Sequence, residues 1–453
     1  MGYEHRREYT EAVGRDASAA GRALFLNGGP DFPGSEYQSD EYFGELSVPV
    51  FRDSFLGEYA ELSGSYRTFD YTTAGTGDVY GVNLVYRPIA DITFKTSFNT
   101  SFRAPDLSEN FGPLGETFAN GFVDPCATAS IIVQNADIRA NRVANCTALA
   151  QQQGRTFDFN GVTATNTDDF NPIYSGGVSG LTGGNPLLTP EESESFTFSV
   201  ALQPRFIPNF SLVLDYYEIE LDQVIAFVSA QTAANNCVSG PSLNSTACSN
   251  IFRNNPDIPF GLGAPVNDPI GGFIEGAGNY AALTTRGLDF TARYGYDFDE
   301  MMGHAWGRLD YSIAGSWLLE QENFLDPAVP TNFTSDRGNL FYPNVRFTSS
   351  LTYTPNDIWS VNWTADWQSA NNIQRNRDFV LNADNRDTQY NDTGNFVRND
   401  FTVRYNVRED TTVRFGVVNA FDEEQSPALG QTLYSNFDPY GRRFFVGLNY
   451  RPF

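Results

Sequence analysis

Apolar and polar side chains alternate strictly along several stretches of the chain. In residues 359–367, every second position is apolar and holds Trp359, Val361, Trp363, Ala365 or Trp367. The positions between them hold Ser360, Asn362, Thr364 and Asp366. Residues 92–103, 288–298 and 401–407 follow the same pattern. A period of two predicts β-strands with one apolar and one polar face.

The length of these stretches favours strands that cross a membrane. About fourteen of them occur, and most are roughly 9 to 14 residues long. Ordinary strands have about 5 or 6 residues, whereas a strand tilted across a bilayer needs about 9 to 11. We therefore expect an all-β protein that lies in a membrane.

The connections between the predicted strands alternate between short and long. The short connections are residues 50–59, 87–91, 203–209, 354–358 and 408–411, and two of intermediate length are 73–77 and 299–304. The long connections are 13–34, 107–191, 229–282, 325–344, 370–395 and 422–441. This alternation predicts an antiparallel up-and-down transmembrane β-barrel with short periplasmic turns and long extracellular loops, above all 107–191 and 229–282. A soluble β-sandwich is the alternative, but its edge strands would be left unprotected.

Composition narrows the function classes. The 453 residues include 40 Gly, 38 Phe and 23 Tyr but only 3 Met, a mixture that favours strands and turns over helices. No run of about 18 apolar residues occurs, so helical membrane spans are not expected. The net charge is -26, and Lys95 is the only lysine. A nucleic-acid partner is therefore not predicted, because it would require a basic face.

Five short motifs lie at predicted strand ends. They are Phe102-Arg103-Ala104-Pro105 with Leu107 and Glu109, Gly184-Asn185-Pro186 with Pro190 and Glu191, Thr285-Arg286-Gly287-Leu288, Val418-Asn419-Ala420-Phe421, and Gly441-Arg442-Arg443-Phe444-Phe445. In this order they resemble the C-terminal barrel of TonB-dependent outer-membrane receptors. The resemblance covers nearly the whole chain apart from the long loops, and it also includes the aromatic last residue, Phe453.

The resemblance implies a partial barrel over residues 1–453. About fourteen strands would belong to a barrel of about 22, with the plug and the TonB box outside this chain. It further implies the outer membrane of a Gram-negative bacterium, contact with lipid and lipopolysaccharide, and uptake of a scarce nutrient such as a siderophore or carbohydrate. The TonB complex would act only through the missing plug. The alternatives are a passive porin-like channel closed by these strands alone and a soluble adhesion or binding module.

The motif residues are expected to be mainly architectural. Pro105 would end hydrogen bonding where its strand leaves the sheet, and Pro186 and Pro190 would stiffen the return. Arg103 is expected near the outer rim, paired with a loop carboxylate; a ligand-binding Arg103 is the alternative. Phe453 is out of phase with Tyr450, which leaves its use as a barrel-assembly signal open.

Four cysteines lie in the two longest connections, and neither CxxC spacing nor a histidine cluster accompanies them. Three pairings are possible, and sequence proximity favours structural disulfides Cys126–Cys146 and Cys237–Cys248. No catalytic motif, cofactor site or metal site is predicted, and acidic groups such as Asp168 with Asp169 are interpreted as solvated loop acids. Ligand contacts are not specified. Loop aromatics either stack on a ligand or pack against each other: Phe111, Phe118, Phe122, Tyr174, Phe260, Phe273, Tyr280, Phe341 and Tyr342.

Overall fold

A computed structural model describes residues 1–13, 31–160, 162, 166–174, 177–263, 271–303, 305–324, 333–373, 391–426, 429 and 437–451. Within them, fourteen long strands form one antiparallel meander. They are β1 (Gly2–Ala12), β2 (Phe32–Ser54), β3 (Gly57–Tyr71), β4 (Gly75–Ile89), β5 (Ile92–Arg103), β8 (Glu191–Leu202), β9 (Phe210–Val228), β10 (Ile274–Asp297), β11 (Arg308–Phe324), β13 (Val345–Thr354), β14 (Trp359–Gln368), β15 (Phe396–Arg408), β16 (Thr411–Val418) and β17 (Arg443–Tyr450). Each strand in this series pairs with the next.

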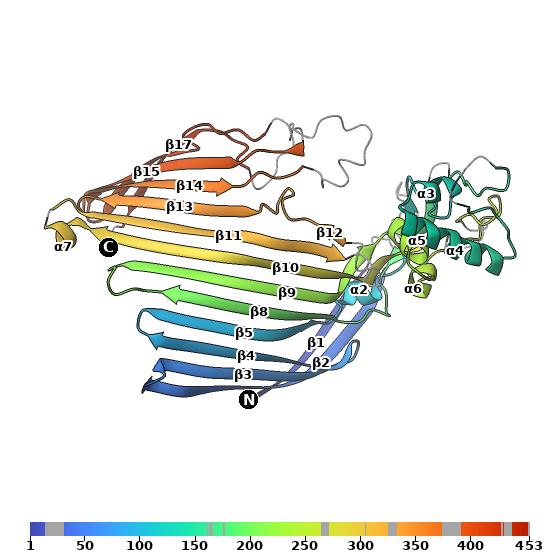
Figure 1. The fold of residues 1–453 in the computed structure, drawn as a ribbon, viewed down its shortest axis with the longest axis horizontal. Coiled ribbons are helices and arrows are strands. Elements are labelled where there is room, and N and C mark those ends of the chain that lie inside the picture. The colour runs from blue at the N-terminus through green and yellow to red at the C-terminus, as the bar shows by residue number, and fades with distance from the viewer. Residues whose placement is uncertain are drawn as a thin grey trace.

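The sheet is curved, with short turns at one end of the strands and long connections at the other, where residues 72–74 between β3 and β4 are the exception (Figure 1). Within the described residues, β1 pairs only with β2 and β17 only with β16, so the barrel is not closed. The predicted all-β, up-and-down fold with about fourteen strands is confirmed. Among the helices of the described residues, none has both the length and the apolar character needed to cross a membrane.

One face of the sheet is apolar and exposed. The cross-strand register places on it large side chains that are 39% to 71% exposed, among them Leu46, Leu62, Val82, Phe198, Leu214, Trp317, Val403, Phe415 and Leu448. They come from strands distributed across the whole sheet. Soluble proteins rarely expose an apolar surface of this extent, which is typical of contact with lipid.

Two long connections fold together beyond the strand ends (Figure 1). We call residues 104–190 and 229–273 the helical insert. It contains α2 (Leu107–Phe111), β6 (Gly115–Ala119), α3 (Thr128–Ile132), α4 (Ala136–Gln152), β7 (Val178–Gly183), α5 (Ala230–Ser239) and α6 (Ser245–Cys248). The short α7 (Phe298–Met302) and β12 (Phe333–Ser335) lie elsewhere. The connection predicted to end at residue 282 ends at 273, because β10 already begins at Ile274 and pairs there with β7.

Among the described residues, two buried apolar clusters lie in the helical insert, and a third, outside it, contains Leu340, Phe396, Leu429 and Phe437. One cluster surrounds Cys126 and Cys146 and includes Ile131, Phe159 and Phe170. A second cluster joins Phe122 of the first connection to Ala234 and Phe273 of the second. A single sheet has no second layer to pack against, so the insert carries a core of its own.

Candidate ligand-binding site

A pocket of about 560 Å³ lies on the polar face of β10, β11, β13, β14 and β15. Two adjacent cross-strand rows line it. The first row is Asp289, Ser316, Arg346, Gln368 and Phe396, and the second contains Ala314, Thr348, Asp366 and Arg398. Its volume falls in the range of roughly 300–1,000 Å³ found for small-molecule sites.

Some charged groups of the pocket are paired with each other. Arg398 donates to Asp366, which also accepts from the Thr348 hydroxyl at 2.7 Å. A second carboxylate, that of Asp400, lies 3.4 Å from Arg398 Nε. The guanidinium of Arg398 is therefore neutralised by the protein.

Other polar groups of the pocket are available. The Nε of Arg346 donates to the Ser316 hydroxyl at 3.3 Å, but its two Nη groups have no partner among the described residues. The same part of the chain provides no hydrogen-bond partner for the buried Nε2 of Gln368. The Asp289 carboxylate is exposed and accepts no hydrogen bond in the described structure, but Arg346 attracts it electrostatically. Leaving a buried polar atom without a partner costs roughly 1–3 kcal/mol, so such an atom calls for an explanation.

Phe396 and Phe437 form the apolar side of the pocket. The centroids of their rings lie 5.3 Å apart in an edge-to-face arrangement, and both side chains are buried. The next residue, Asp438, accepts from Arg443 at 2.7 Å, while its Oδ2 is buried without a hydrogen-bond partner in the described structure. Burial opposes ionisation of Asp438, but Arg443 and the Tyr440 backbone N–H outweigh it and lower its pKa. Asp438 is therefore a carboxylate at neutral pH.

Arg103 lies at the end of β5, outside this pocket. It donates to Glu191 at 2.6 and 2.7 Å and to Glu109 at 3.0 and 3.2 Å. Glu109 also completes a capping box with Asp106 at the start of α2. Arg103 thus ties the exit from β5 to the entry into β8, a positioning role in which it donates four hydrogen bonds.

The proline motifs lie at the same junction. Pro105 is fully buried. The Asn185 side chain donates to the Ala277 carbonyl at 3.2 Å and accepts from the Leu187 backbone N–H at 3.0 Å. Pro186 is exposed and lines a cavity of about 450 Å³ beside the start of β10. These residues hold the return from the helical insert into the sheet.

The remaining motif positions shape strand ends. Arg286 is paired with Glu320 on β11, and the register shifts between Arg286 and Gly287. Asn419 is fully buried with φ of 53°, and its side chain exchanges two hydrogen bonds with the backbone of Glu423. Asn tolerates this left-handed conformation better than most residues. Phe421 is exposed, Ala104 is half-buried, and Phe453 lies outside the described residues.

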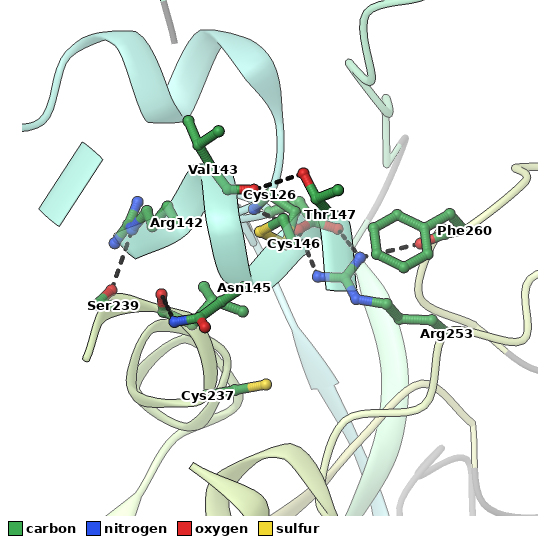
Figure 2. The surroundings of a disulfide bond; sticks show 12 residues. Cys126, Arg142, Val143, Asn145, Cys146, Thr147, Cys237, Ser239, Arg253 and Phe260 are labelled. Atoms are coloured by element: carbon green, nitrogen blue, oxygen red, sulfur yellow. Dashed lines mark hydrogen bonds and ion pairs between the residues drawn. A yellow bond between two sulfur atoms is a disulfide. The ribbon is translucent and has the colours of Figure 1, made fainter. Parts of the chain in front are cut away.

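The two parts of the helical insert are joined by Arg253, which reaches into the core around the first disulfide (Figure 2). Its guanidinium lies 4.3 Å from the centre of the Phe260 ring and donates to the Phe260 carbonyl at 3.0 Å. Nearby, Asn145 of α4 donates to the carbonyls of Val238 and Gly240. Of the loop aromatics, Phe122, Phe260 and Phe273 are buried here and pack the insert.

Both disulfides lie in the helical insert and cross-link it. Cys126 pairs with Cys146, and Cys237 pairs with Cys248, the same pairings that sequence proximity favours. Cys126 and Cys146 are completely buried. Elsewhere in the insert, Asp158, Asp168 and Asp169 have oxygen atoms within 4.8 Å of one another. Asp168 is exposed there, and Asp158 accepts hydrogen bonds from Asn160, so we infer no metal site.

Comparisons with known proteins identify the class of this sheet. A family model described as "TonB dependent receptor-like, beta-barrel" matches residues 1–420. The chain therefore belongs to the TonB-dependent receptor family, as its sequence motifs predict. A search of curated proteins finds no match to this chain.

Two solved receptors illustrate the shared fold. The siderophore receptor PirA from Acinetobacter baumannii is 14% identical with a TM-score of 0.56, and the match covers 99% of this chain and 51% of PirA. The ferric enterobactin receptor PfeA from Pseudomonas aeruginosa, solved as a Q482A mutant with enterobactin, is 13% identical with a TM-score of 0.55. That match covers 99% of this chain and 52% of PfeA. This chain thus spans about half the length of these receptors.

Proposed function

We propose that this chain forms part of the barrel wall of an outer-membrane receptor that imports a small nutrient with energy from TonB. The observation that carries the proposal is the division of the sheet into two faces. One face exposes large apolar side chains from β2 to β17, and the other holds a polar pocket. Lipid outside and an aqueous passage inside account for both faces.

In such a receptor, the pocket and the helical insert would have different roles. The insert lies at the end of the sheet that carries the long connections, which in this proposal faces outward (Figure 1). The pocket lies on the polar face, at the ends of β13, β14 and β15 that carry long connections, and would bind the nutrient as it enters. In this proposal the outer-membrane location, lipid and lipopolysaccharide contact, and action of the TonB complex through a plug follow from family membership.

A passive channel closed by these strands alone fits the structure less well. It would require hydrogen bonds between β1 and β17, and within the described residues neither strand has a second neighbour. Unpaired strand edges are not tolerated in the hydrocarbon region of a membrane. The receptor is therefore the single function we propose.

Comparison of two deletion strains tests the proposal without knowledge of the ligand. One strain lacks this gene and the other lacks TonB. Mass spectrometry of the spent medium should show that both strains leave unconsumed the same compound, which the parent strain takes up. The protein should sediment with outer membranes in a density gradient. A protein recovered in the aqueous fraction, or a compound whose consumption needs this gene but not TonB, would overturn the proposal.

A further inference from the structure

The unpaired groups of the pocket on β10 to β15 include both hydrogen-bond donors and acceptors. The donors are the Nη groups of Arg346 and the Nε2 of Gln368. The acceptors are the carboxylate of Asp289 and the Oδ2 of Asp438. A hydroxyl group both donates and accepts, so a ligand with several hydroxyls can satisfy all of them at once.

The charges of the pocket do not favour an anion. Arg346 and Arg398 lie among Asp289, Asp366 and Asp438, so the acidic groups outnumber the basic ones. Arg398 is already paired with Asp366, although its buried Nε has no hydrogen-bond partner. The two Nη groups of Arg346 are further donors without a hydrogen-bond partner among the lining residues that the structure describes. These carboxylates would repel an anionic ligand, or the ligand would need to displace them from their partners, which costs free energy.

A soft or borderline metal ion is also a poor match. The lining residues in the described structure include no histidine, cysteine or methionine. A soft or borderline metal prefers these donors. The aromatic pair Phe396 and Phe437 instead gives the pocket an apolar side, against which C–H groups of a ligand can pack.

We infer that this pocket binds a neutral polyhydroxylated ligand, an oligosaccharide, through Arg346, Gln368 and Asp289. The inference rests on the proposed receptor function and names its substrate class. A bound hydroxyl would satisfy the buried Nε2 of Gln368, and Arg346 and Asp289 would bind neighbouring hydroxyls. The volume of about 560 Å³ accommodates a small ligand of this kind.

Ligand binding by the 453-residue protein in detergent tests this inference. The probes are a printed array of neutral and acidic oligosaccharides and a ferric tris-catecholate chelate, with each positive result measured by isothermal titration calorimetry. We expect at least one neutral oligosaccharide to bind, with a Kd that changes less than about twofold between about 0.05 and 0.5 M NaCl. An anion would show a much steeper dependence on salt.

Two variants and a control test whether the ligand binds in the pocket. Arg346→Met should weaken oligosaccharide binding at least about tenfold, and Gln368→Leu about fivefold, since each removes donors to the ligand. Arg404→Met is the matched control, because Arg404 lies on the polar face of β15 outside the pocket and should leave affinity unchanged. All three should keep the circular dichroism spectrum of the parent protein.

Each contrary outcome has a distinct meaning. Tight binding of the ferric chelate with loss in Arg346→Met would overturn the neutral ligand while leaving the receptor function intact. Oligosaccharide binding unaffected by Arg346→Met and Gln368→Leu would overturn the site. Binding of neither probe would overturn the inference, and the strain comparison would then decide separately whether the protein is a TonB-dependent receptor.

Discussion

Arg253 and Asp124 form two parallel hydrogen bonds of 2.8 Å between segments 129 residues apart in the chain. Both side chains are buried, with 5% and 0% exposed. Asp124 also accepts from the Tyr174 hydroxyl at 3.0 Å and from the Cys126 backbone N–H at 2.9 Å. The ion pair thus fixes the second connection of the helical insert to the first.

Removing one partner should unfold the insert without unfolding the sheet. In Arg253→Met, the Asp124 carboxylate stays buried without its cation, which costs roughly 3–5 kcal/mol. Amide hydrogen exchange in α4 and α5 should therefore accelerate, while exchange in β9 and β10 remains slow. Arg155→Met is the control, because Arg155 is an exposed arginine of the same unit. Unchanged protection of α4 and α5 would show that the pair contributes little.

Reduction of the disulfides should also affect the insert. Cys126→Ala with Cys146→Ala opens a loop of 20 residues, and the equivalent change at Cys237 and Cys248 opens one of 11 residues. Loss of either bridge should destabilise the unit by roughly 2–4 kcal/mol, with a slightly larger effect for the longer loop. Urea titration followed by limited proteolysis measures this. Equal protease resistance of the reduced and oxidised parent protein would contradict the prediction.

The alternation of side chains was sufficient to predict the sheet. Positions such as Trp363 and Trp367 lie on one face because the pleat has a period of two, a local property of the backbone. The helical insert was not predicted. Its longest helix, α4, begins at a good N-cap, Asn135, and is rich in alanine. That local signal was present, but it lies in a connection that was interpreted only as a loop.

The pocket depends on information that a single strand does not contain. Arg346, Gln368 and Asp289 become neighbours only through the register of β10, β11, β13 and β14. A shift of one residue in any pairing would turn a strand's polar side chains to the opposite face. The polar character of these positions was predictable from the sequence, whereas their convergence on one site was not.

Arg103 should stabilise the junction between β5 and β8 only modestly. It is 44% exposed, so water screens its pairs with Glu191 and Glu109. We expect Arg103→Met to cost roughly 1 kcal/mol, near the upper end for a surface ion pair. Arg103→Lys should recover only part of the loss, because lysine cannot donate in the forked arrangement. Urea unfolding midpoints of the three proteins check the order, and a lysine variant equal to the parent would contradict it.

Two neighbouring residues of β8 place their side chains on opposite faces of the sheet, which in the proposed receptor are the lipid face and the passage face. Phe198 lies on the exposed apolar face, and Thr197 points to the opposite face, where its hydroxyl lies 2.6 Å from that of Ser97. An arginine on the lipid face near the middle of the bilayer costs roughly 2–4 kcal/mol. Phe198→Arg should therefore lower the stability of the protein refolded into lipid vesicles by about that amount.

Thr197→Arg is the matched control, with the same new charge one residue away. Its guanidinium would enter the aqueous side, so the loss should be smaller, roughly 1 kcal/mol from the hydroxyl pair that it removes. Tryptophan fluorescence during urea titration in vesicles measures both variants against the parent. A greater loss in Thr197→Arg than in Phe198→Arg would place lipid on the other face of the sheet, and the receptor assignment would then be wrong.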